Sequence, residues 1–285
     1  MSYTYSPLRY PGGKSKLFNY TKDLIITNNL VGCTYVEPFA GGAGLALALL
    51  YNKIVDNIIL NDIDRSIYAF WYSVLNYNEE FCKLIENSPI SLDEWNKQKN
   101  IQEDKRNTDL LTLGFSTFYL NRTNRSGIIK GGIIGGKKQL GNYKMDCRFN
   151  KANLISRIKR ISLYRDKISI YNLDASIFID NVITLLNNNS LVFIDPPYYK
   201  KGPELYENHF KHDDHLKLST KIVNTIAHPW VITYDNTDEI KTMYKNFTQA
   251  EFNLNYSAQN KYQGKEVMVY SEILTPIPFK KASEE

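Results

Sequence analysis

Short apolar runs typical of buried strands alternate with helical patterns along most of this chain, and this alternation limits the fold more than any other feature. Strands separated by helices favour an α/β fold, a parallel sheet with helices on both faces. The strand-like runs lie near residues 34–38, 57–62, 167–172, 190–194, 230–234 and 267–271.

The stretch between residues 65 and 148 interrupts the alternation. Its apolar residues follow helical spacing up to about Tyr119, and a glycine-rich basic stretch follows. We therefore expect an inserted, mainly helical domain at 65–148 that ends in a basic arm or hairpin. The remaining segments, 1–64 and 149–285, then form the α/β domain.

The net charge of +5 is unevenly distributed. Residues 121–160 contain eleven Lys and Arg and a single acidic residue, Asp146, so this segment is +10 and the rest of the chain is −5. Such a concentration of charge favours a polyanionic partner. The alternative is a solvated loop and helix face without a partner.

The strand near 190–194 runs directly into Asp195-Pro196-Pro197-Tyr198. Because proline has a fixed φ and no N–H, the two prolines make a stiff turn whose carbonyls accept hydrogen bonds. Asp195 adds a carboxylate acceptor and Tyr198 a flat ring for stacking. The segment therefore suits a planar substrate that carries an amine; an ordinary strand end is the alternative.

A glycine-rich turn follows the first strand, in the sequence from Glu37 to Gly44. Glycine lets a loop turn tightly and lets a ligand approach the backbone. Asp62 ends the next strand, where a carboxylate can receive the hydroxyls of a ribose. This pattern does not separate a dinucleotide from another adenosyl cofactor.

Three further patterns bound the interpretation. The first residues lack the charged and apolar regions of a signal peptide, and no apolar run is long enough to span a bilayer. The isolated Cys33, Cys82 and Cys147 suggest neither a disulfide framework nor a zinc site. The run from Lys211 to His215 is interpreted as the start of a helix and not as a metal site, so no metal is expected.

Together these motifs resemble the Dam-type (D12 class) DNA adenine methyltransferases. The resemblance covers nearly the whole chain and includes the order of the motifs. They are Tyr10-Pro-Gly-Gly-Lys14, Glu37-Pro-Phe-Ala-Gly-Gly, Asp62 after a strand, Leu120-Asn-Arg-Thr and Asp195-Pro-Pro-Tyr198.

The resemblance implies a Rossmann-like methyltransferase sheet, S-adenosyl-L-methionine as cofactor, and methyl transfer to the exocyclic amine of an adenine flipped out of duplex DNA. Asp195, Pro196, Pro197 and Tyr198 are then catalytic. The family pattern gives the cofactor-binding residues as Tyr10, Lys14, Glu37, Phe39, Gly41, Asp62, Asp174 and Asp195.

The resemblance also places target recognition in the insertion. It implies DNA contacts for a set of basic and amide side chains that begins at the Leu120-Asn-Arg-Thr motif. These residues are Asn121, Arg122, Asn124, Arg125, Lys130, Lys137 and Lys138. The chain lacks the Phe-Asn-Val-Pro-Phe-Gly-like run of enzymes that read GATC and has Lys130-Gly-Gly-Ile-Ile-Gly-Gly-Lys-Lys138 in its place, so no target sequence is assigned.

Two alternatives stay open. One is an RNA methyltransferase or an enzyme acting on the amine of cytosine, because the Asp-Pro-Pro-Tyr chemistry requires only a conjugated amine. The other is a non-catalytic DNA-binding protein of the same fold. For the leading interpretation we expect a monomer or weak dimer in the cytoplasm of a bacterial or phage-infected cell. It would have no membrane partner. A restriction endonuclease would be a partner only in the sense of belonging to the same restriction-modification system.

Overall fold

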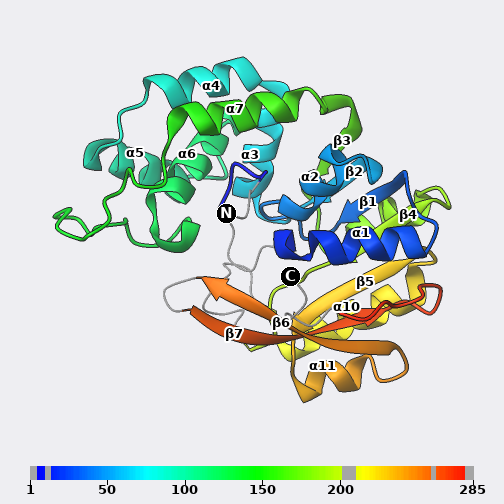
Figure 1. The fold of residues 1–285 in the computed structure, drawn as a ribbon. Coiled ribbons are helices and arrows are strands. Elements are labelled where there is room, and N and C mark those ends of the chain that lie inside the picture. Colours follow the sequence, from blue (N-terminus) through cyan, green and yellow to red (C-terminus); the bar gives the residue numbers. More distant parts are fainter. Residues whose placement is uncertain (1–4, 10–13, 201–209, 258–260, 280–285) are drawn as a thin grey trace.

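The computed structural model describes residues 5–9, 14–200, 210–257 and 261–279. Within them a seven-stranded sheet runs through the molecule, in the order β3-β2-β1-β4-β5-β7-β6 (Figure 1). Neighbours from β3 to β5 pair in parallel, and β7 pairs antiparallel with both β5 and β6. The strands are β1 (Cys33–Glu37), β2 (Val55–Asn61), β3 (Ile168–Tyr171), β4 (Ser190–Ile194), β5 (Trp230–Asp235), β6 (Thr248–Ser257) and β7 (Lys261–Tyr270).

Helices cover both faces of this sheet because its central strands are apolar on both sides. Tyr35 and Phe193 face one hydrophobic core, which also contains residues of α1 (Phe18–Thr27) and α2 (Gly44–Tyr51). Val36 and Val192 face the second core, with residues of the remaining helices. Those helices are α8 (Ala175–Asn181), α10 (His212–Thr225) and α11 (Asp238–Met243). The strand order 3-2-1-4-5 and the two helical layers confirm the predicted Rossmann-like architecture.

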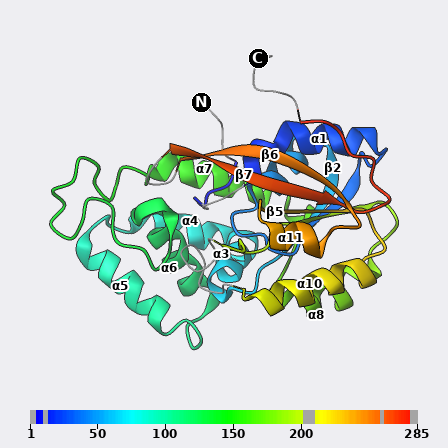
Figure 2. The same ribbon diagram turned by 90° about the horizontal axis from the view of Figure 1, so that it is seen from below.

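A helical lobe lies between β2 and β3 in the sequence and to one side of the sheet (Figures 1 and 2). Inside it Phe70 stacks on Phe118, and Phe81 packs edge-to-face against both rings. Gly114 lets two of its helices cross closely, because a Cβ there would lie 2.5 Å from Ala69 O. The helices are α3 (Arg65–Asn76), α4 (Asn78–Asn87), α5 (Leu92–Glu103), α6 (Leu110–Thr123) and α7 (Lys151–Ser162).

Helix α7 follows the predicted domain boundary at residue 148 but packs on the lobe. Asn78 Nδ2 donates to Ile158 O at 3.1 Å, and Lys151 Nζ donates to Glu86 O at 2.8 Å and to Ser88 O at 2.7 Å. The lobe therefore includes a helix that the sequence boundary assigns to the α/β part.

The basic segment from residue 125 to 148 is not a paired hairpin. It begins with the short 3-10 helix η2 (Arg125–Gly127) and continues in turns and bends. A single antiparallel bridge joins Asn124 to Ile133. The prediction of a hairpin is therefore wrong, because the glycines provide turns without a run of strand-forming residues to pair.

Strand β6 was not expected from the sequence. Its alternation is weak, since Asn253 and Asn255 lie among its apolar residues. It lies at the edge of the sheet and, within the described part of the chain, pairs only with β7. Among the described residues, every helix is too short or too polar to cross a membrane.

Candidate active site

Asp195 lies immediately after β4, where the turns following the parallel strands converge on one edge of the sheet. Its Oδ1 receives hydrogen bonds from Lys14 Nζ at 2.8 Å and from Thr233 Oγ1 at 2.9 Å. Its Oδ2 accepts no hydrogen bond from the residues that the structure describes, and the side chain is 24% exposed. Among the described residues, one carboxylate oxygen is thus fixed by hydrogen bonds and the other accepts none, which leaves it available to a ligand.

Lys14 begins the 3-10 helix η1 (Lys14–Leu17), and its side chain is only 4% exposed. Besides Asp195, its ammonium contacts the Tyr198 hydroxyl at 3.1 Å and lies 5.1 Å from the centre of the Tyr198 ring. Tyr198 is 3% exposed. The predicted stacking face is therefore not presented to a base in this structure, and the stacking role of Tyr198 stays a prediction.

Hydrogen bonds to Asp235 hold the C-terminal end of the turn that follows Asp195. The backbone N–H groups of Tyr199 and Lys200 donate to the Asp235 carboxylate at 2.8 and 2.9 Å. Pro196 is buried and Pro197 is partly buried. Since Asp235 ends β5, both β4 and β5 fix the turn that carries the predicted catalytic residues.

The glycine-rich turn and Asp62 are joined directly. Gly41 N donates to Asp62 Oδ2 at 2.9 Å, and Asp64 N donates to Asp62 Oδ1 at 2.9 Å. Gly41 has φ 46°, a conformation that favours glycine, and its carbonyl accepts from Trp71 Nε1 at 2.9 Å. The carboxylate retains lone pairs for a diol, so the residues present fit the ribose of an adenosyl cofactor.

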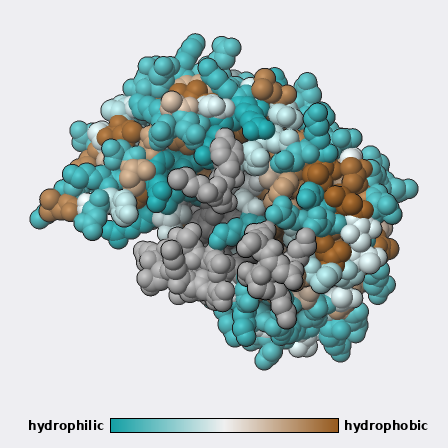
Figure 3. Space-filling view, in the orientation of Figure 1, coloured by the Kyte–Doolittle hydropathy of each residue, from teal (hydrophilic) through white to brown (hydrophobic). Residues whose placement is uncertain are grey.

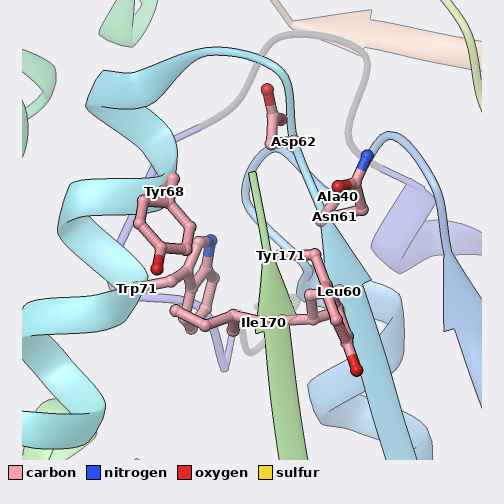
Figure 4. A pocket seen from close by; sticks show the side chains of 8 residues that line it. All are labelled: Ala40, Leu60, Asn61, Asp62, Tyr68, Trp71, Ile170 and Tyr171. Atoms are coloured by element: carbon pink, nitrogen blue, oxygen red, sulfur yellow. The ribbon is translucent and has the colours of Figure 1, made fainter. Parts of the chain in front are cut away.

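A mainly apolar recess opens beside this carboxylate, between α3 and the strands β2 and β3 (Figure 4). Tyr68 and Trp71 form its wall on α3, opposite Leu60 and Ile170 on the strands. Burial raises the pKa of Asp62 to about 7, and the neighbouring Asp64 carboxylate contributes. The recess is lined by Ala40, Leu60, Asn61, Asp62, Tyr68, Trp71, Ile170 and Tyr171.

The other predicted cofactor residues are distributed along the same edge. Glu37 is 7% exposed, and burial raises its pKa to about 8, with a further rise from the nearby Asp195. Phe39 is half-buried with its ring centre 6.0 Å from that of Phe210. Asp174 is exposed and caps α8 by accepting from Ser176 N at 2.8 Å. Tyr10 lies outside the described residues.

Comparison with known proteins decides the family. Residues 10–258 match the family of D12 class N6 adenine-specific DNA methyltransferases. The chain belongs to this family. It is similar to the type II methyltransferase M.CviBI of Paramecium bursaria Chlorella virus NC1A, 23% identical over 87% of this chain and 90% of that protein. It is also similar to the retron Ec67 DNA adenine methylase of Escherichia coli, 22% identical over 93% and 90%.

The chain is therefore a DNA adenine methyltransferase that uses S-adenosylmethionine as methyl donor. In this methyltransferase, three of the predicted DNA-contacting side chains are buried. Asn121 bonds Arg9 N, Arg9 O and Gly127 O at 2.7–2.8 Å. Asn124 accepts from Trp95 Nε1 at 2.7 Å and donates to two carbonyls of the basic segment.

Arg122 is the third, and its guanidinium donates to Pro7 O. Burial lowers its pKa to about 9, and Arg157, Arg9 and Arg148 add to the effect. The prediction of DNA contacts by the side chains of Asn121, Arg122 and Asn124 is corrected by this structure. They instead hold residues 7–9 and the basic segment in place. The basic composition of the region suggested DNA contacts and gave no sign of this structural role.

Four other predicted contacts remain accessible. Arg125, Lys130, Lys137 and Lys138 are exposed, on the segment that extends outward from the helical lobe (Figures 1 and 2). The lobe side of the molecule presents a largely hydrophilic surface, whereas more hydrophobic residues gather on the opposite side (Figure 3). The exposure of these four side chains is compatible with contacts to a phosphate backbone.

The run Lys211–His215 begins α10, as the sequence predicts, and Asp214 accepts from Lys211 N at 3.0 Å. His215 is buried with its Nδ1 3.1 Å from the Tyr234 hydroxyl, and burial lowers its pKa to about 4. In the described part of the chain, no three His, Cys, Asp or Glu side chains are grouped in a way that could hold a metal ion.

Three residues of the site received no role from the sequence: Thr233, Asp235 and Glu266. Thr233 fixes Asp195, Asp235 fixes the following turn, and Glu266 accepts from the Tyr198 hydroxyl at 2.8 Å. Two of them lie in the run Ile232-Thr-Tyr-Asp-Asn, and the third starts Glu266-Val-Met. Strand pairing, and not the sequence of either run, shows that they serve this site.

Proposed function

We propose that this enzyme methylates adenine within specific sequences of duplex DNA and that Asp195 is the residue that prepares the target amine. The observation that carries the proposal is the asymmetric carboxylate: Lys14 and Thr233 hold Oδ1, while Oδ2 is open. In this proposal Oδ2 and the Pro196 carbonyl accept the two hydrogens of the amine. Since the amine is inaccessible in a duplex, the base must first be flipped out.

Holding both hydrogens changes the chemistry of the nitrogen. The lone pair of an adenine amine is delocalised into the ring, and two fixed acceptors favour the pyramidal geometry in which it is localised. When bound, S-adenosylmethionine supplies an electrophilic methyl group. The Asp195 carboxylate stabilises the positive charge that grows on the nitrogen and is a suitable acceptor for its departing proton, so no histidine base is required.

We assign the cofactor to the edge formed by the glycine-rich turn, Asp62 and Lys14, together with Glu37, Phe39 and Asp174. We assign target recognition to residues 65–148, and catalysis and cofactor binding to 1–64 and 149–285. The joined Gly41 and Asp62 support the first assignment. The exposed basic side chains of the lobe support the second.

We further propose that the enzyme acts as a monomer or weak dimer in the cytoplasm of a bacterial or phage-infected cell. Any restriction endonuclease would be a separate protein. The relative M.CviBI is named as a type II methyltransferase alone, which supports the separation of any endonuclease. Sedimentation of the purified chain with and without DNA tests the stoichiometry.

Transfer of a labelled methyl group tests the proposed function. We expect label on duplex DNA, with N6-methyladenine at one recurring sequence when the modified DNA is sequenced. Label on RNA but not DNA, or on cytosine, would overturn the proposal. DNA retention without transfer under any condition would favour a binding protein of the same fold.

The exposed lysines give a second test. Replacing Lys137 and Lys138 together with alanine should weaken DNA binding about equally for all sequences. It should also reduce the slope of log K against log salt by roughly 1.8, because each lost phosphate contact removes about 0.9. Unfolding free energy should stay within about 0.5 kcal/mol of wild type, since both side chains are exposed. Replacing Lys53, an exposed lysine before β2, is the matched control.

A further inference from the structure

Glu266 lies on β7 at the back of the site and is 1% exposed. Its Oε1 accepts from the Tyr198 hydroxyl at 2.8 Å, and its Oε2 lies 3.7 Å from Lys14 Nζ. Lys14 therefore lies between two carboxylates, Asp195 in front and Glu266 behind. Tyr198 bridges the same pair from the side, since its hydroxyl contacts both Lys14 and Glu266.

We propose that Glu266 is a positioning residue for methyl transfer, holding Lys14 and Tyr198 so that Lys14 fixes Asp195 Oδ1 and leaves Oδ2 directed at the target amine. The inference rests on the proposed role of Asp195. Glu266 would not contact the substrate itself and would act only through Lys14 and Tyr198.

A purely structural role explains Glu266 poorly. Burying a carboxylate costs several kcal/mol, and its strand neighbours Val267, Met268 and Val269 show that this strand packs well with apolar residues. Asp195 alone already supplies a counter-charge for Lys14 at 2.8 Å. The carboxylate of Glu266 is useful because it restricts the positions of the Lys14 ammonium and the Tyr198 phenol.

The charge of Glu266 changes near neutral pH. Burial raises its pKa to about 7; Lys14 lowers it, Asp195 and Asp235 raise it, and the Tyr198 hydroxyl lowers it. Across the sheet, β5 places Asp235 opposite it and β6 places the uncharged Phe252. Below pH 7 the neutral acid loses its attraction for Lys14, so kcat at saturating cofactor and DNA should rise as pH rises through about 7.

The test replaces Glu266 with glutamine, which keeps the shape and can still accept from Tyr198. We expect kcat to fall about 10- to 100-fold, as for a small misplacement of reacting groups, and the rise of kcat near pH 7 to disappear. Cofactor and DNA dissociation constants should change less than about threefold. Glu266→Asp, which restores the charge with a shorter reach, should recover part of the rate and the pH dependence. Glu272→Gln, at an exposed glutamate just after β7, is the control.

An unchanged kcat and pH profile in E266Q would overturn the inference. A loss of kcat that comes together with lower thermal stability and weaker cofactor binding would also overturn it, because a role in folding alone would produce all three effects. The proposed function fails separately, if an Asp195 variant keeps full activity.

Discussion

Replacing Asp195 with asparagine is expected to lower kcat for methyl transfer about 10²- to 10³-fold, the loss typical of removing one group that stabilises charge in a transition state. Lys14 and Thr233 both donate to Oδ1, so the asparagine oxygen should remain on that side. The amide nitrogen then occupies the place of Oδ2. Its N–H groups would face the N–H groups of the target amine. The amide nitrogen therefore cannot accept a hydrogen bond from the amine and cannot hold it.

The measurement is single-turnover transfer to duplex DNA at saturating cofactor, with DNA retention measured in parallel. Retention should be largely kept, because the exposed basic segment is untouched. Thr233→Val removes one of the two bonds to Oδ1 and should cost less, about tenfold. If Asp195→Asn transfers methyl groups at the wild-type rate, Asp195 does not hold the amine.

The sequence predicted that Asp62 and Asp195 lie at one edge of the sheet, and the structure agrees because the signals for these strand ends are local. A strand that ends in Asp195-Pro196-Pro197, and another that ends at Asp62, mark the carboxyl edge of a parallel sheet without knowledge of the rest of the fold. The structure brings both carboxylates to that edge and joins Asp62 to Gly41. Chemistry that sits at the end of a single strand can be identified from the strand alone.

Features that depend on pairing between distant segments could not be predicted in this way. Glu266 serves the site only because β7 inserts between β5 and β6, and β6 itself has a weak pattern. Composition was misleading in the basic segment. An arginine or asparagine is usually exposed. Here Asn121 and Arg122 donate to the carbonyls of Arg9 and Pro7, far away in the sequence, and Asn124 donates to the nearby carbonyls of Ile128 and Ile129.

The corrected role of Asn121 leads to the second large effect. Asn121→Ala should lower the free energy of unfolding by about 3 kcal/mol, because Arg9 N, Arg9 O and Gly127 O lose their partner together. Residues 7–9 precede Lys14 by a few positions in the chain. Loosening them should therefore also lower kcat, by about tenfold, through Lys14 and Asp195. Urea unfolding and single-turnover transfer measure the two effects.

Arg125→Ala is the matched comparison, since both residues were predicted to contact DNA but only Arg125 is exposed. It should weaken DNA binding and reduce the salt slope by about 0.9, with unfolding free energy within about 0.5 kcal/mol of wild type. Asn121→Ala should leave the salt slope unchanged. Gly127→Ala should resemble Asn121→Ala, because a Cβ at φ 77° would collide with Arg9 O. A stable Asn121 variant with a reduced salt slope would show instead that Asn121 contacts DNA and that its bonds to Arg9 do not stabilise the fold.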